Sequence, residues 1–96
     1  MSGYVLSPSA QADLDEIWDY SAKRWGEDGA ERYVRDLWRG IERVAADPRQ
    51  GRAYDEVRAG YSRYTVRSHV LFYRLVPGGI DVVRILHQSM DFKRHL

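Results

Sequence analysis

The sequence changes its hydrophobic period once, and this change limits the folds that it can adopt. Up to residue 47 the apolar side chains recur every three or four residues, which is typical of helices with one buried face. From residue 61 onward β-branched and aromatic side chains dominate, which favours strands. Helices followed by a run of strands predict an α+β fold, in which the helices pack on one face of a mainly antiparallel sheet.

The helical part contains two segments. Ser7-Pro8 is a helix start, because serine caps the first turn and proline suits its first position. The first apolar stripe ends at Trp25, and Gly26 is a stop signal. The second stripe ends before Pro48. We therefore expect two helices joined by a few residues into an antiparallel hairpin.

Four strands are expected around this hairpin. Residues 4–6 precede it, and residues 61–66, 69–76 and 80–87 follow it, the last two joined by a turn at Pro77-Gly78-Gly79. Residues 48–60 show no sustained period and are interpreted as a loop. The expected order is βααβββ in a single domain over residues 1–96, with no assignment for residues 88–96.

The two faces of the late strands differ in composition. The set expected to meet the helices is Leu71, Tyr73 and Leu75 with Val83 and Ile85. The set on the opposite face is Val70, Phe72 and Arg74 beside Leu86, Arg84 and Val82. Because a two-helix hairpin covers one side only, we expect the second face to be an uncovered apolar patch with arginines in it. The alternative is that the C-terminal tail folds over it.

Charge and composition point to a partner and a compartment. Residues 1–48 have 6 basic and 10 acidic side chains, net −4, and residues 49–96 have 9 and 4, net +5. A basic half favours an acidic partner, either nucleic acid or an acidic protein segment. The chain has no cysteine, which excludes disulfides and favours a reducing compartment. It also lacks a membrane-length apolar run and a signal sequence, so we expect a cytoplasmic protein.

No sequence motif for a cofactor or a catalytic centre is present. His87, Asp91 and His95 have helical spacing for a metal site, but His87 closes a strand pattern, so no metal is predicted. A metal-free ribonuclease would need cations and an acid–base group, which Arg63, Arg74, Arg84 and His87 could supply in part. Surface arginines and a strand-end histidine are the favoured interpretation.

Two further patterns are interpreted as structural. Arg35, Arg39 and Arg43 form a row on the second helix, which we interpret as a solvated face with Glu31 placed to pair with Arg35. The three tryptophans fall on apolar stripes and are expected in the core. They are Trp18, Trp25 and Trp38.

The order of elements coincides with a set of short segments that spans nearly the whole chain. These are Leu6-Ser7-Pro8, Ala12-Asp13-Leu14, Glu16-Ile17-Trp18-Asp19-Tyr20, Ala30-Glu31-Arg32-Tyr33, Gly51-Arg52, Val57-Arg58, Gly60-Tyr61, Ser68-His69-Val70, Phe72-Tyr73-Arg74, Val83-Arg84-Ile85-Leu86-His87-Gln88 and Met90-Asp91. In these segments the chain resembles the ParE toxins of bacterial type II toxin-antitoxin modules.

The resemblance implies a helical hairpin on a twisted antiparallel sheet and neutralisation by a ParD-like antitoxin. In such families the antitoxin's C-terminal segment lies along the groove between hairpin and sheet. Its N-terminal part dimerises and binds operator DNA, so DNA is touched only through the antitoxin. ParE-like chains are known for poisoning DNA gyrase, which implies a protein contact without catalysis and without a cofactor.

The related RelE-like toxins, which cut messenger RNA on the ribosome, are the alternative. Gln88 stands where RelE-like chains often carry arginine, and Phe92 stands near their terminal tyrosine. Phenylalanine has no hydroxyl for proton transfer. Arg84 and His87 remain as candidate catalytic residues, so cleavage stays open. An interaction module without toxicity is a third alternative.

For antitoxin contact we select the basic and aromatic far face with its margin. The selected residues are Tyr61, Arg63, Phe72, Arg74 and Arg84. An acidic antitoxin tail would be steered by the basic half, and apolar contacts would supply most of the affinity.

Overall fold

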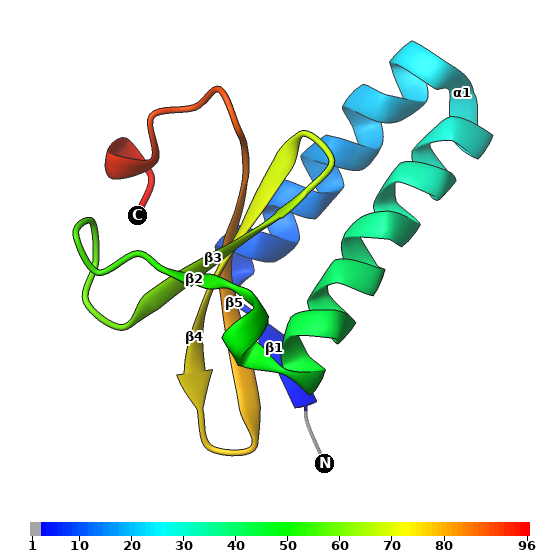
Figure 1. Cartoon of the computed structure of the whole chain (residues 1–96). Coiled ribbons are helices and arrows are strands. Elements are labelled where there is room, and N and C mark those ends of the chain that lie inside the picture. Colours follow the sequence, from blue (N-terminus) through cyan, green and yellow to red (C-terminus); the bar gives the residue numbers. More distant parts are fainter. Residues whose placement is uncertain (1–2) are drawn as a thin grey trace.

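The helical part of the chain folds back on itself at Gly26. The computed structural model describes residues 3–96 and contains one helical element, α1 (Pro8–Ala46). The backbone of Gly26, with φ 81° and ψ 173°, interrupts it, and the two arms run antiparallel (Figure 1). The Ser7 hydroxyl accepts a hydrogen bond from the Ala10 amide at 3.0 Å, which caps the first turn. The expected hairpin and its start and stop signals are confirmed.

Five strands form the sheet, in the order β1-β5-β4-β3-β2. Their bounds are β1 (Gly3–Leu6), β2 (Arg52–Ala53), β3 (Tyr61–Val66), β4 (His69–Val76) and β5 (Gly79–His87). β1 pairs with β5 in parallel, and the other pairs are antiparallel. The α+β fold is confirmed, and β2 adds a strand within the expected loop. Two residues are too few to show a period, so no pattern could predict β2.

Both arms of α1 cover the same face of the sheet, and one core lies between the arms and the sheet (Figure 1). Leu37 and Ile41 from the second arm are fully buried, as are Leu71 and Ile80 from the sheet. Trp38 packs against this core. The other two tryptophans are not in the core as expected: Trp18 is 37% exposed and Trp25 51%. Trp25 instead stacks on Tyr33, with ring centroids 5.9 Å apart.

A bulge changes the expected register between β4 and β5. Val70 lies opposite Leu86 and Phe72 opposite Arg84, as expected, but the register shifts between Phe72 and Tyr73. Tyr73 therefore pairs with Val82, and Arg74 lies opposite Asp81 instead of Val82. The prediction that Val83 joins the helix-facing core is wrong, because the bulge places Val82 there and turns Val83 to the opposite face.

Leu75 was expected in the helix-facing core and is 69% exposed. β3 begins at Tyr61, which lies opposite Arg74. The last two residues of β4, Leu75 and Val76, therefore extend beyond the first residue of β3. Leu75 has no neighbouring strand on that side, and alternation along β4 could not show where β3 begins.

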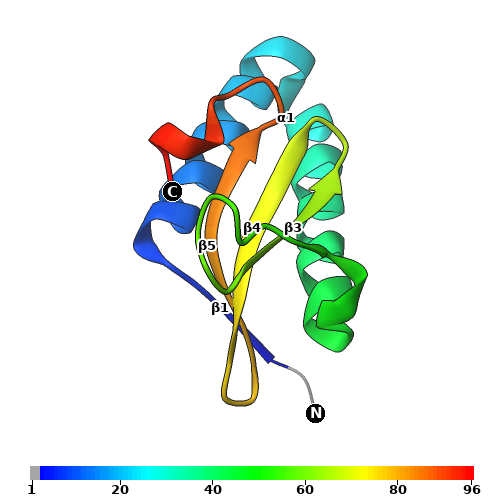
Figure 2. The same cartoon turned by 60° about the vertical axis from the view of Figure 1, so that its left-hand side comes forward.

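The far face of the sheet is covered by the chain itself, so the expected open patch is wrong and the tail alternative is correct. Val70, Phe72 and Leu86 are at most 3% exposed and form a second buried cluster. Its cover comes from Tyr54 and Val83 and from two tail residues, Phe92 and Leu96. Figure 1 shows the tail (red) on the side of the sheet away from α1, and Figure 2 shows its short 3-10 turn Phe92–Arg94 beside β5.

The two tail residues Phe92 and Leu96 cover the second cluster, and Phe92 does so through contacts with two aromatic rings. The Phe92 ring meets Phe72 edge-on, with centroids 4.9 Å apart, and meets Tyr54 at 6.2 Å. The Arg58 guanidinium donates to the Leu96 carbonyl at 3.3 Å and holds the end of the chain. No helix within residues 3–96 has the length and apolarity to cross a membrane.

Phe92→Ala is expected to destabilise the protein by about 2 kcal/mol, because it removes aromatic contacts and exposes Phe72. The adjacent Lys93→Ala removes an exposed side chain and should cost less than about 0.5 kcal/mol. Urea unfolding of both variants measures the difference. Equal stabilities would show that the tail does not contribute to the second cluster in solution.

Candidate functional site

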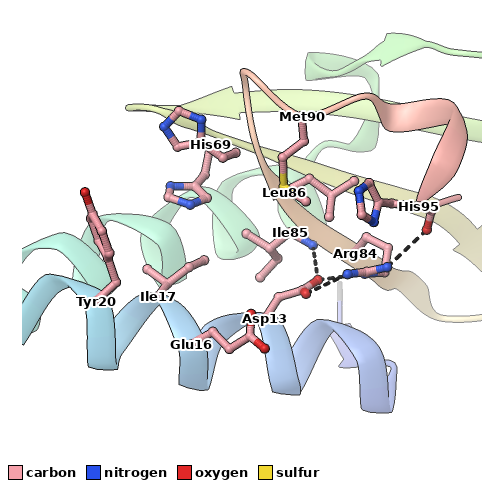
Figure 3. Close-up of a pocket in the computed structure, with 11 residues that line it drawn as sticks. Asp13, Glu16, Ile17, Tyr20, His69, Arg84, Ile85, Leu86, Met90 and His95 are labelled. Carbon is pink, nitrogen blue, oxygen red and sulfur yellow. Dashed lines mark hydrogen bonds and ion pairs between the residues drawn. The ribbon is translucent and has the colours of Figure 1, made fainter.

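A cavity of about 420 Å³ opens between the first arm of α1, the end of β5 and the C-terminal tail (Figure 3). Its lining combines apolar and titratable side chains: Asp13, Glu16, Ile17, Tyr20, His69, Arg84, Ile85, Leu86, His87, Met90 and His95. Tyr20 is 63% exposed and stands at the rim, and Ile17 lies deeper on the same arm. The cavity is therefore an apolar recess that is open to solvent and has charged groups on one wall.

An ion pair between Asp13 and Arg84 forms that wall. The Arg84 Nε and Nη2 atoms each donate to one oxygen of the Asp13 carboxylate, both at 2.8 Å (Figure 3). The Ile85 amide donates to the same carboxylate at 2.9 Å. Because the Asp13 carboxylate accepts these hydrogen bonds, the pKa of Arg84 is raised above its ordinary value. The pair ties the first arm of α1 to β5.

Arg84 also binds the tail, because its Nη1 donates to the His95 carbonyl at 3.1 Å. Its guanidinium thus binds the carboxylate of Asp13 and the backbone of the tail at once. A phosphate could reach it only in competition with those partners.

Two histidines occupy the other end of the cavity. The rings of His69 and His87 meet edge-on, with centroids 5.2 Å apart. The Tyr33 hydroxyl lies 2.6 Å from His69 Nδ1 and accepts from the Ser68 amide at 3.3 Å. The Tyr33 hydroxyl therefore links the His69 ring to the backbone of the β3–β4 turn.

Burial and, to a smaller extent, the nearby His87 lower the pKa of His69 from 6.5 to about 4, while Asp13 acts in the opposite direction. His69 is neutral at neutral pH. His87 Nδ1 accepts from the Ser89 amide at 3.1 Å and lies 2.7 Å from the Ser89 hydroxyl. Both rings are thus held by neighbouring side chains.

The cavity does not offer a metal site. Within residues 3–96 no group of three or more His, Cys, Asp or Glu side chains is arranged to hold a metal ion. His87 ends β5, and Asp91 caps the 3-10 turn of the tail, so their spacing with His95 does not align them on a helix.

The five residues selected for antitoxin contact do not share one cavity. Arg84 lines the cavity just described, whereas Phe72 lies fully buried beneath the tail. Arg74 pairs with Asp81 at 3.1 Å. Tyr61 is covered by the Arg58 guanidinium at 5.7 Å, and Arg63 lies over the Tyr54 ring at 4.8 Å. Their role in antitoxin binding stays a prediction.

The alternative catalytic pair, Arg84 and His87, does line the same cavity. Sequence reasoning did not select Asp13, Tyr20, His69 or Met90 as functional residues, and it considered His95 only as a metal ligand. A signal existed for Asp13, because it falls between Ala10 and Leu14 on the buried stripe, where a carboxylate needs a partner. For the others no local pattern could have shown that β4, β5 and the tail converge.

Comparison with known proteins identifies the family. The family model described as "ParE toxin of type II toxin-antitoxin system, parDE" matches residues 4–92. Toxin ParE1 of Mycobacterium tuberculosis is 57% identical over 99% of this chain and 98% of its own length. The chain belongs to the ParE toxin family. Toxin ParE1 of Caulobacter vibrioides is 47% identical over 100% of this chain and 99% of its own length.

The ParE fold is also found among solved structures. A chain described as "Chromosomal ParDE TA system from P. aeruginosa" superposes with a TM-score of 0.78, covering 91% of this chain and 96% of its own. At 22% sequence identity this likeness shows the fold alone. The resemblance to ParE toxins noted in the sequence is confirmed.

The stability of this ParE toxin is expected to fall as the pH drops from about 6.5 to about 4. The unfolded chain protonates His69 near pH 6.5, but the folded protein does not until about pH 4, so acid favours unfolding in that interval. The slope should not exceed about 1 kcal/mol per pH unit, because solvent reaches part of the ring.

Urea unfolding between pH 7 and 4.5 measures this slope. His69→Gln removes the titrating group and should make the curve flatter, whereas Ser9→Ala, at an exposed position without a titratable group, should leave the slope unchanged. Equal slopes for the parent protein and His69→Gln would show that His69 titrates normally in the folded state.

Proposed function

We propose that this ParE-family chain is neutralised by a ParD-like antitoxin and poisons DNA gyrase through protein contact, without catalysing a reaction, in the cytoplasm. The observation that carries the proposal is the full-length similarity to ParE toxins, with the family model matching residues 4–92. The resemblance of the sequence to ParE toxins implies gyrase as the target and a ParD-like antitoxin as the partner, and the proposal extends both to this chain.

The contacts of Arg84 and Phe92 support a mechanism without catalysis. Ribonuclease chemistry needs a cation free to stabilise the developing phosphate charge. Arg84 is the cationic candidate in the cavity, and its donors already bind Asp13 and the His95 carbonyl. Phe92, at the position near the RelE-like tyrosine, packs into the second cluster and has no hydroxyl to donate. These contacts favour gyrase poisoning over messenger cleavage.

The cavity also supports a place for the antitoxin. The resemblance implies an antitoxin segment between hairpin and sheet, and the cavity lies between the first arm of α1 and β5. Its accessible apolar groups are Tyr20 and Met90, which are 63% and 36% exposed. Exposed aromatic and methionine side chains around a recess are typical anchors of a protein interface. Contact with Phe72 would additionally require the tail to move, because the tail covers that residue.

Purified toxin is expected to inhibit supercoiling by gyrase and to increase the amount of cleaved DNA in the presence of gyrase. Preincubation with the product of an adjacent antitoxin gene should abolish both effects. A supercoiling assay and a cleavage-complex assay measure them.

Two outcomes would contradict this mechanism. Unchanged supercoiling with no cleaved DNA would exclude gyrase poisoning. Specific message cleavage in a translating extract, lost in His87→Ala, would establish the ribonuclease alternative.

Tyr20→Ala is expected to weaken antitoxin binding more than about tenfold, because the ring is the largest exposed apolar group at the cavity. Leu75→Ala is the matched control, since Leu75 is 69% exposed at the far end of the sheet. It should change affinity less than about twofold. Calorimetric titration measures both, and equal losses would place the antitoxin elsewhere.

A further inference from the structure

Two adjoining hollows at the free edge of β3 form a surface that shares only Arg63 with the residues selected for antitoxin contact. They have volumes of about 320 and 310 Å³ and share Tyr64 and Thr65 in their linings. The first hollow adds Gln50, Arg52 and Arg63. The second adds residues of the second arm of α1, Val66 of β3 and Arg67 of the β3–β4 turn. In Figure 2, β3 runs beside that arm (green).

Four cations gather here without a carboxylate partner: Arg39, Arg43, Arg52 and Arg63, called the arginine groove below. In the described part of the chain none of the four forms an ion pair. The one carboxylate that lines either hollow, Asp36, is paired with Arg67 at 2.8 Å. The groove therefore keeps a concentrated positive charge in a protein whose net charge is only +1.

The topology places the four arginines around one edge of the sheet, with the two of the second arm on the helix-facing side and the two of β2 and β3 on the side of Phe72. Arg39 and Arg43 are one helical turn apart on the second arm, and Arg52 lies opposite Arg63 in the β2–β3 pair. β2 pairs only with Ser62 and Arg63, so β3 beyond Arg63 has no strand on its outer side. The sequence row of Arg35, Arg39 and Arg43 is thus divided: Arg35 pairs with Glu31, as predicted, while the other two face the groove.

Two of the four guanidiniums are held in place by aromatic side chains. Arg63 lies over the Tyr54 ring at 4.8 Å, and Arg43 Nη1 donates to the Tyr64 hydroxyl at 3.3 Å. Cations that are already oriented lose less conformational entropy when they bind a ligand.

We propose that the arginine groove binds the phosphate backbone of duplex DNA, without reading its sequence. Guanidinium matches phosphate geometry with paired donors, and all the cations of the groove are arginines. Gln50, Tyr64 and Thr65 add neutral side chains of the kinds that contact phosphate oxygens. The toxin then contacts DNA directly, in addition to the indirect contact through the antitoxin that the sequence led us to expect.

The composition of the hollows favours DNA over an acidic peptide. A protein interface draws most of its affinity from apolar pockets, and the first hollow has no aliphatic side chain in its lining. Binding to the backbone of nucleic acid depends on charge and needs no such pocket. Single strands are less suited, because they stack their bases on open aromatic rings, and the Tyr64 ring packs against the main core.

The test is fluorescence anisotropy of a labelled DNA duplex of arbitrary sequence with the full-length toxin at several salt concentrations. Four phosphate contacts predict that log K falls with log salt concentration at a slope between about −3 and −4. Arg39→Gln with Arg52→Gln, one from each hollow and neither selected for antitoxin contact, should change the slope to about −2. The same variant should lose more than about tenfold in affinity at 0.1 M salt, an order-of-magnitude figure.

The matched control is Arg24→Gln with Arg94→Gln, which removes the same charge from exposed positions outside the groove. It should keep the slope of the parent protein, and thermal unfolding of both variants shows whether they are folded. The anisotropy assay contains neither gyrase nor antitoxin, so its result does not depend on whether the gyrase proposal is correct.

Four results would overturn the assignment to DNA. They are no binding by the parent protein at low salt, equal losses in the two double variants, displacement of DNA by an equimolar acidic peptide, and tighter binding of an RNA duplex than of the DNA duplex. The third result would assign the groove to an acidic protein segment.

Discussion

The ion pair between Asp13 and Arg84 links three separate parts of the molecule. It joins the first arm of α1 to β5, and Arg84 extends the connection to the tail through the His95 carbonyl. Both side chains are largely removed from water, at 10% and 24% exposure, so each needs the other as a partner. The connection forms one wall of the cavity and reaches the tail that covers the second cluster.

The same contact supports the proposal that the cavity serves recognition. The Arg84 guanidinium already binds a carboxylate and a carbonyl, and a histidine kept neutral by burial is a poor proton donor. What remains accessible is the apolar rim around Tyr20. The arginine groove is the opposite kind of surface, with unpaired cations and little apolar lining. β4 separates the strands that carry the two sites, so one molecule has room for two partners.

The errors in prediction have one physical origin, which is that side-chain alternation describes a strand but not its neighbours. The bulge after Phe72 exchanges Val82 and Val83, and the start of β3 opposite Arg74 leaves Leu75 exposed. The far face looked open because the tail is short, yet Phe92 and Leu96 seal it. None of these outcomes depends on the local pattern, since each is decided by a contact between distant parts of the chain.

The sequence by itself determined the elements and the family. The change of period, the cap at Ser7, the break at Gly26 and a turn after Val76 act over a few residues, so the chain encodes them locally. The turn is the two residues Pro77-Gly78, one shorter than expected, because Gly79 already pairs with Val76. Only the tertiary structure decided which charges are paired. Asp13 meets Arg84 across 71 residues, whereas Arg39 and Arg52, from an arm and a strand, line adjoining hollows without a carboxylate partner. Pairing depends on distance in space, and spacing along the chain does not reveal that distance between separate elements.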